Sequence, residues 1–246
     1  MWFPTWLGEV YVKLFSRFGT ELFTFKKARD LLGFNENKLA VSFSKLHSYR
    51  VLLIFDSGKP RLYRLLDPEN FVLLASEVIR NVDRIVQERY VKLLCDVFRL
   101  IQKTLDLSSF AVYGSVARGV AEKHSDIDIL VVSNDFFGSI GSRIDRLYDV
   151  EVKLKDEISW LRKHGVYTSL SFYPLREDEA KRVPLLFLDL TEEAIVMYDK
   201  NRFLENILTE LKARLTKLGG RRIFIDKEKW YWDLKPDYKF GEEIII

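Results

Sequence analysis

Residues 110–132 have the sequence FAVYGSVARGVAEKHSDIDILVV and contain the features that decide the fold. The first apolar run has the length of a short buried strand, and Gly114-Ser115 follows it where a helix can begin. The second apolar run is predicted to be another strand, and side-chain alternation places Asp126 and Asp128 on one face of it. The stretch therefore predicts a domain that mixes strands and helices, with polar groups gathered at strand ends.

These residue types in this order favour a metal-nucleotide site. Gly114 permits close approach of the backbone to a ligand, and the Ser115 hydroxyl and the amides at the helix start can donate hydrogen bonds to a triphosphate. Two neighbouring carboxylates, Asp126 and Asp128, repel each other in a partly dry site unless a cation neutralises them. Mg²⁺ is the expected cation because it prefers carboxylate and phosphate oxygens. The alternative is that the aspartates only cap a strand and the glycine makes an ordinary turn.

The spacing closely resembles the signature of minimal nucleotidyltransferases of the DNA-polymerase-β superfamily. The shared elements are Gly114-Ser115, ten intervening residues, Asp126-x-Asp128, the internal Ala117-Arg118-Gly119 and Ser125 before the first aspartate. The resemblance extends over residues 107–200. It implies that Asp126 and Asp128 are catalytic and hold Mg²⁺, and that the nucleotide is bound by Gly114, Ser115, Arg118 and Ser125.

The same resemblance implies a reaction. An acceptor hydroxyl would attack the α-phosphate of ATP or another nucleoside triphosphate, and pyrophosphate would leave. The expected product is a nucleoside monophosphate, AMP as the first expectation, attached to a hydroxyl of a protein, an RNA or a small molecule. Minimal nucleotidyltransferases of this kind often modify a partner protein.

A third carboxylate, usual in active members of the superfamily, is missing from the expected place. The best candidate strand is 166–173, which contains no Asp or Glu and has Ser169 and Ser171 in its polar positions. Asp189 could substitute, although a helix-surface or capping role fits its surroundings better. The competing hypothesis is therefore a DNA-binding regulator whose nucleotidyltransferase fold binds nucleotide but is catalytically silent.

The first 68 residues predict a separate unit. Apolar residues at helical spacing indicate three short helices, with Thr24 and Asn35 as N-caps of the second and third. Two apolar runs at 51–55 and 62–66 flank a turn and predict a β-hairpin. This order resembles a winged helix-turn-helix fused to the nucleotidyltransferase, an archaeal-type arrangement.

In winged helices the third helix and the hairpin contact nucleic acid. We expect phosphate contacts to DNA or RNA from Lys38, Lys45 and Arg50 on the third helix and from Lys59 and Arg61 on the hairpin, where Arg64 also lies. The alternative is that these residues are solvated charges on a unit used for docking or for a homodimer.

The rest of the chain divides into three predicted segments. Apolar residues recur at helical spacing between Phe71 and Thr104, which predicts one long helix within a connecting segment, 69–106. The nucleotidyltransferase domain is expected over 107–200, and a helix and an aromatic-rich tail over 201–246. The predicted fold class is α+β, with a mixed sheet flanked by helices.

Composition sets limits on the remaining possibilities. The formal net charge of +3 is too small to indicate nucleic-acid binding by itself. No apolar window is long enough for a membrane span and the first residues lack a basic leader, so we expect a cytoplasmic protein without a membrane partner. One Cys and three His exclude a disulfide framework and a zinc cage. The many charges and the rarity of Gln favour a thermophilic source.

Overall fold

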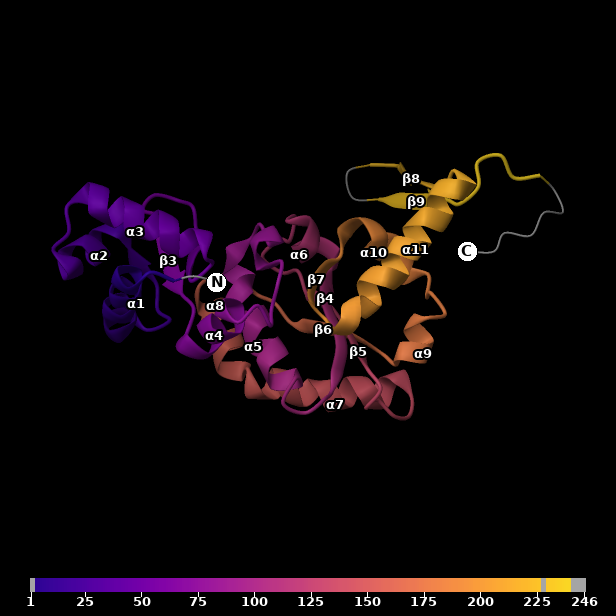
Figure 1. Ribbon diagram of the computed structural model, residues 1–246, viewed down its shortest axis with the longest axis horizontal. Coiled ribbons are helices and arrows are strands. Elements are labelled where there is room, and N and C mark those ends of the chain that lie inside the picture. The colour runs from indigo at the N-terminus through magenta and orange to yellow at the C-terminus, as the bar shows by residue number, and fades with distance from the viewer. Residues whose placement is uncertain (1–2, 227–228, 240–246) are drawn as a thin grey trace.

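A mixed four-stranded sheet lies at the centre of the computed structural model, which describes residues 3–226 and 229–239 (Figure 1). Its strands stand in the order β6-β5-β4-β7, and β4 runs antiparallel to both of its neighbours. Strands β5 and β6 are parallel. The strands are β4 (Leu107–Tyr113), β5 (Ile127–Ser133), β6 (Leu170–Leu175) and β7 (Ile195–Asp199). The predicted α+β class with a mixed sheet is confirmed.

Helices cover both faces of this sheet because its side chains alternate between two cores. Ile129 of β5 packs with the first set of helices, whereas Leu130 packs with the second set. The first set is α5 (Val91–Ile101), α7 (Ile140–Lys153) and α8 (Lys155–Lys163), and the second is α10 (Leu186–Glu193) and α11 (Phe203–Leu218). Because side chains alternate along a strand, Asp126 and Asp128 point to the same face of the sheet as Leu130, the face covered by α10.

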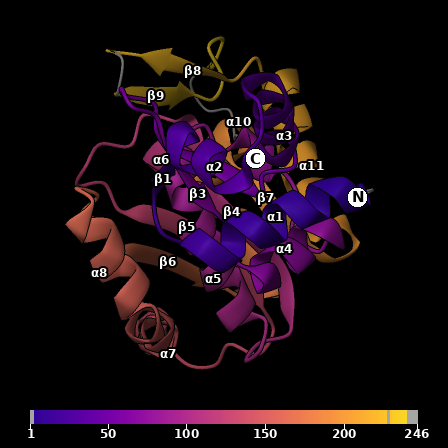
Figure 2. The ribbon, with the colours of Figure 1, turned by 90° about the vertical axis from the view of Figure 1, so that its left-hand side faces the viewer.

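The N-terminal unit has its own core and its own small sheet, and it lies at one end of the molecule (Figures 1 and 2). Its elements are α1 (Thr5–Phe18), β1 (Phe23–Thr24), α2 (Phe25–Leu32), α3 (Glu36–Ser48), β2 (Leu52–Asp56) and β3 (Leu62–Leu65). The Thr24 and Asn35 side chains accept hydrogen bonds from the amides of Lys27 and Lys38, at 3.3 and 2.8 Å, so both predicted N-caps are confirmed. Three helices and a hairpin therefore follow one another as expected.

The long helix expected between Phe71 and Thr104 was wrong. The segment contains α4 (Pro68–Ala75), two short 3₁₀ turns and α5. Glu77 and Asn81 have positive φ angles of 58° and 59°, which a right-handed helix cannot contain. The Arg80 amide and the Asn81 side chain bond to carbonyls of β7, so this segment covers the edge of the sheet. The helical periodicity came from two helices that both pack on the core.

Other predicted elements shift or divide. The helices α7 and α8 follow each other directly and meet at Leu154. The helix expected over 201–217 is α11, and the aromatic-rich tail forms a hairpin of β8 (Arg221–Phe224) and β9 (Trp230–Asp233). The acidic end at Glu242 and Glu243 lies outside the described residues. Short helices α6 (Gly114–Arg118) and α9 (Glu177–Ala180) complete the set of α-helices in the described ranges.

A buried ion pair joins the N-terminal unit to α8. The Arg64 side chain is only 2% exposed, and its Nη2 donates to Glu157 Oε2 at 2.7 Å. Its Nε donates to the Thr20 carbonyl at 2.7 Å, and the guanidinium stacks on the Trp160 ring at 3.6 Å. The expectation that Arg64 lies on an exposed nucleic-acid surface was therefore wrong. Its side chain is buried between the two units, where it is paired with Glu157.

Within residues 3–226 and 229–239, no helix combines the length and apolar character that crossing a bilayer requires.

Candidate functional site

The glycine turn and the second aspartate are in direct contact. β4 ends at Tyr113, and its antiparallel neighbour β5 places Asp128 opposite that residue. Gly114 follows with φ of 69°, and a Cβ added there would lie 2.2 Å from Asp128 Oδ2. Both the conformation and the space therefore require glycine at position 114. The predicted pairing of turn and carboxylate is present in the structure.

Two serines of the neighbouring strand hold the aspartates. Ser169 Oγ donates to Asp126 Oδ1 at 2.6 Å, and Ser171 lies in register with Asp128 and hydrogen bonds to its carboxylate. These serines occupy the positions where a third carboxylate was sought. The side chains of Asp126, Asp128, Ser169 and Ser171 thus form one polar cluster at the start of two parallel strands.

The pKa of Asp128 is raised above its ordinary value. Burial is the largest cause, and the negative charges of Asp126 and Glu193 act in the same direction. The hydrogen bond from Ser171 and the charge of Arg118 oppose this rise but do not overcome it. A bound cation would relieve both the burial cost and the repulsion, which is the electrostatic condition expected of a metal ligand.

Glu193, which the sequence analysis did not single out, is part of this cluster. Its side chain is 6% exposed and binds Arg118 Nη1 at 2.8 Å, and the Gly114 amide donates to its Oε1 at 3.4 Å. It stands at the end of α10, just before β7, whose first residue pairs with Val112. A lone Glu before a strand is too common a pattern for sequence alone to have identified it.

Asp189 anchors the C-terminal hairpin instead of supplying a third catalytic carboxylate. Its Oδ1 accepts hydrogen bonds from Trp230 Nε1 at 2.8 Å, Trp232 Nε1 at 2.9 Å and Arg222 Nη2 at 2.9 Å. The Trp230 ring lies 5.0 Å from the Arg118 guanidinium, so the anchored hairpin reaches the site. The hairpin therefore borders Arg118.

The two predicted serines have different surroundings. Ser115 is partly buried in the first turn of α6, directly after the glycine. Ser125 Oγ accepts the Glu122 amide at 2.8 Å, and its carbonyl accepts Thr168 Oγ1 at 2.9 Å. Ser125 thus stabilises the loop that leads to Asp126.

The predicted nucleic-acid residues divide into exposed and occupied groups. Lys38, Lys45, Lys59 and Arg61 are exposed, with the Lys38 and Lys45 ammonium groups over the rings of Phe34 and Trp6. Arg50 is paired with Glu88 and also donates to the Asp83 carbonyl at 3.0 Å. Arg50 therefore holds the N-terminal unit against the following segment.

The donor set suits magnesium better than a metal that needs a full protein cage. Within residues 3–226 and 229–239, no group of three or more His, Cys, Asp or Glu side chains is placed to hold a metal ion. Mg²⁺ in nucleotide enzymes is commonly held by one or two carboxylates, with substrate phosphates and water completing its shell. Asp126 and Asp128 match this requirement.

Comparisons with known proteins identify the family of this domain. The family model for the nucleotidyltransferase domain matches residues 95–186. The "Putative protein adenylyltransferase MJ1305" of Methanocaldococcus jannaschii is 30% identical over 125 residues, which are 50% of this chain and 79% of that protein. The chain therefore belongs to this nucleotidyltransferase family, and it is a transferase enzyme. The predicted superfamily membership is confirmed for this domain.

Two solved toxin–antitoxin structures align with about half of this chain. A crystal structure of a toxin–antitoxin with AMP-PNP has a TM-score of 0.33 at 14% identity, and the match covers 51% of this chain and 92% of that one. A mutant of the toxin–antitoxin MntA-HpeT has a TM-score of 0.31 at 16% identity, covering 50% and 89%.

Proposed function

We propose that this chain transfers AMP from ATP, in the presence of Mg²⁺, to an acceptor hydroxyl. The observation that carries the proposal is the contact between Gly114 and Asp128, next to Asp126. This contact places a turn that can accommodate phosphate beside a pair of carboxylates, where β4 ends and β5 begins. ATP is the preferred donor because the relative from Methanocaldococcus jannaschii is named as an adenylyltransferase.

Each residue of the cluster has a role in this proposal. Asp126 and Asp128 hold the metal ion, while Gly114, Ser115 and Arg118 contact the triphosphate. The metal ion, when bound, supplies positive charge where negative charge develops during transfer. The acceptor oxygen forms a bond to the α-phosphorus, the bond to the β-phosphate oxygen breaks, and pyrophosphate leaves. Ser169 and Ser171 are not bases at neutral pH, so the hydroxyl proton passes to water.

Transfer can be tested with α-³²P-ATP and Mg²⁺, with pyrophosphate release measured in parallel. Wild-type protein should release pyrophosphate and the Asp126→Ala/Asp128→Ala variant should not. A matched control is Asp145→Ala/Asp149→Ala, which removes two exposed carboxylates from α7. Equal turnover by the wild type and the Asp126/Asp128 variant would refute the proposal.

A second candidate function is a DNA-binding regulator with a silent nucleotide site. Two observations favour it: Ser169 and Ser171 stand where a third carboxylate was expected, and Lys38 and Lys45 are exposed on α3. In this second function, residues 1–68 would act as a winged helix that binds DNA. Duplex binding that is lost in Lys38→Ala/Lys45→Ala, together with no pyrophosphate release by the wild type, would select it.

Trp230 is expected to affect binding of the triphosphate through Arg118. Trp230→Ala removes a cation–π contact, so the KM for ATP should rise about three- to tenfold, corresponding to about 0.5–1.5 kcal/mol, with little change in kcat. Steady-state kinetics of pyrophosphate release measures both constants.

Tyr231→Ala is the control for that change, because Tyr231 is 54% exposed and alternates to the other face of the hairpin. An equal rise of KM in both variants would mean that loss of the hairpin, and not of the Arg118 contact, is responsible.

A further inference from the structure

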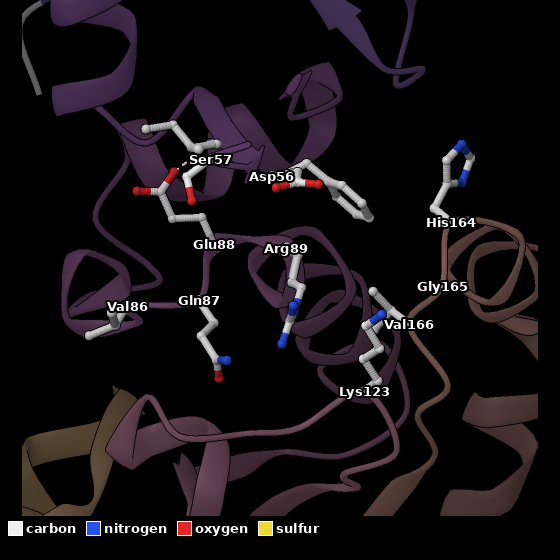
Figure 3. Close-up of a pocket in the computed structure, with 12 residues that line it drawn as sticks. Asp56, Ser57, Val86, Gln87, Glu88, Arg89, Lys123, His164, Gly165 and Val166 are labelled. Carbon is white, nitrogen blue, oxygen red and sulfur yellow. Dashed lines mark hydrogen bonds between the residues drawn. The ribbon is translucent and has the colours of Figure 1, made fainter. Parts of the chain in front are cut away.

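A cleft of about 600 Å³ separates the N-terminal unit from the transferase domain (Figure 3). Asp56 and Ser57 at the end of β2 lie on one side, and Lys123 and Val166 on the other. Arg89 lines its floor, and Figure 3 shows the Arg89 and Lys123 side chains in the space between the two units. The proposed functions leave this cleft without a role.

The cleft has more unpaired positive than negative charge. Among the described residues, neither Lys123, which is exposed, nor Arg89 forms an ion pair. The Arg89 guanidinium donates to the Ala121 carbonyl at 3.1 Å and lies over the Tyr90 ring, so its positive charge is not neutralised. The carboxylate of Glu88, which also lines the cleft, is already bound by Arg50 and His47. Among the described residues that line the cleft, Asp56 is the remaining acidic group. An anionic ligand is therefore favoured over a neutral or cationic one.

Two segments lead from the cleft to the carboxylate pair. Lys123 is three residues before Asp126, and Val166 is three residues before Ser169, so each path spans at most about 11 Å of extended chain. The Tyr167 amide donates to the Lys123 carbonyl at 2.7 Å, which holds the two segments together. The cleft therefore lies beside the two segments that lead into Asp126 and Ser169.

An exposed aromatic pair lies on this route. The rings of His124 and Tyr167 are stacked with centroids 4.9 Å apart, and Tyr167 is 45% exposed. Positive groups that follow a backbone, with aromatic rings on which bases stack, are the features by which proteins bind single-stranded nucleic acid. Two further exposed basic residues, Lys59 and Arg61, follow closely after Ser57 in the sequence.

We infer that the cleft binds the 3′ end of a single-stranded nucleic acid, and that its terminal hydroxyl is the acceptor. The inference rests on the proposed function. Lys123 and Arg89 contact phosphates, and a base stacks on Tyr167. The 3′ oxygen forms a bond to the α-phosphorus of ATP, pyrophosphate leaves, the proton passes to water, and the strand gains one AMP residue.

The test measures binding of a fluorescein-labelled single-stranded RNA of mixed sequence by anisotropy at low and moderate salt. We expect Lys123→Glu to weaken binding about tenfold and to reduce its salt dependence. Tyr167→Ala should weaken it about five- to fiftyfold through lost stacking. Lys153→Glu, which makes the same charge change at an exposed position of α7, should bind as the wild type does.

Binding of a fluorescent ATP analogue with Mg²⁺ is measured on the same proteins and should be unchanged in Lys153→Glu. If the wild type binds the ATP analogue but the RNA affinity is equal in Lys123→Glu, Tyr167→Ala and the control, the acceptor inference fails while the proposed function stands. If the wild type does not bind the ATP analogue, the proposed function fails. Extension of the RNA by one nucleotide supports the inference, and label transfer to a polypeptide in place of the RNA overturns it.

Discussion

Asp128→Asn should lower kcat/KM for nucleotidyl transfer by about 10³-fold or more while the protein stays folded. The expected loss corresponds to about 4 kcal/mol of transition-state stabilisation, the scale at which a bound metal ion contributes to charge neutralisation. Asparagine keeps the shape of the side chain and can accept the hydrogen bond from Ser171, but it does not attract a cation. Pyrophosphate release under saturating Mg²⁺ measures the change.

The same substitution should not destabilise the protein in the absence of Mg²⁺ and nucleotide. The pKa of Asp128 is raised by burial and by Asp126, so the folded state binds a proton at this carboxyl more tightly than the unfolded state does. Stability therefore falls as pH rises from the unfolded pKa through the raised folded pKa. Removing the charge should therefore raise the Tm at neutral pH.

Thermal unfolding at pH 7 and at pH 4 separates the two effects. The gain in Tm should be present at pH 7 and smaller at pH 4, because the raised pKa favours the protonated wild-type carboxyl in acid. Activity of Asp128→Asn within tenfold of wild type would contradict the assignment of this residue to the metal. A lower Tm at pH 7 would mean that the carboxylate stabilises the fold, as a strand-capping residue would.

The sequence was sufficient to predict the Gly114 and Asp128 contact because the side-chain period of a strand is fixed. Alternation along β5 and a glycine turn directly after β4 leave few ways to arrange these residues. The N-caps at Thr24 and Asn35 were predictable for a similar reason, since each acts on an amide three residues away. Features that depend on residues close together in the sequence, such as strand alternation and N-caps, could therefore be predicted.

Residues that depend on contacts between distant segments could not be predicted in this way. Glu193 reaches Arg118 across 75 positions, and Arg64 reaches Glu157 across 93. Arg64 had the same sequence features as Lys59 and Arg61, which are exposed, so only packing against α8 distinguishes it. The break at Glu77 is of this kind too, because its positive φ accompanies the pairing of the next residues with β7.

Arg64→Ala should lower the free energy of unfolding by about 3–5 kcal/mol, because it leaves the Glu157 carboxylate buried with a weaker set of partners. Lys92 Nζ, 3.1 Å from Glu157 Oε2, remains but is shared with Asp96 at 2.6 Å. The variant also loses the stacking on Trp160 and the bond to the Thr20 carbonyl. Urea unfolding followed by circular dichroism measures the loss.

Arg182→Ala is the control, since Arg182 forms an exposed pair with Asp178 at 3.3 Å and should change stability by about 0.5 kcal/mol or less. The double variant Arg64→Met/Glu157→Leu removes both charges and should recover much of the lost stability.

The contribution of this ion pair should depend on pH. Burial raises the pKa of Glu157, but the hydrogen bond and charge of Arg64 outweigh this effect and lower the pKa overall. The pair thus stabilises the fold above the ordinary glutamate pKa, and this contribution is lost as pH falls through the lowered value. The free-energy difference between wild type and Arg64→Ala should therefore narrow in acid. A difference that stays constant as pH falls would show that packing on Trp160, not the ion pair, joins the two units.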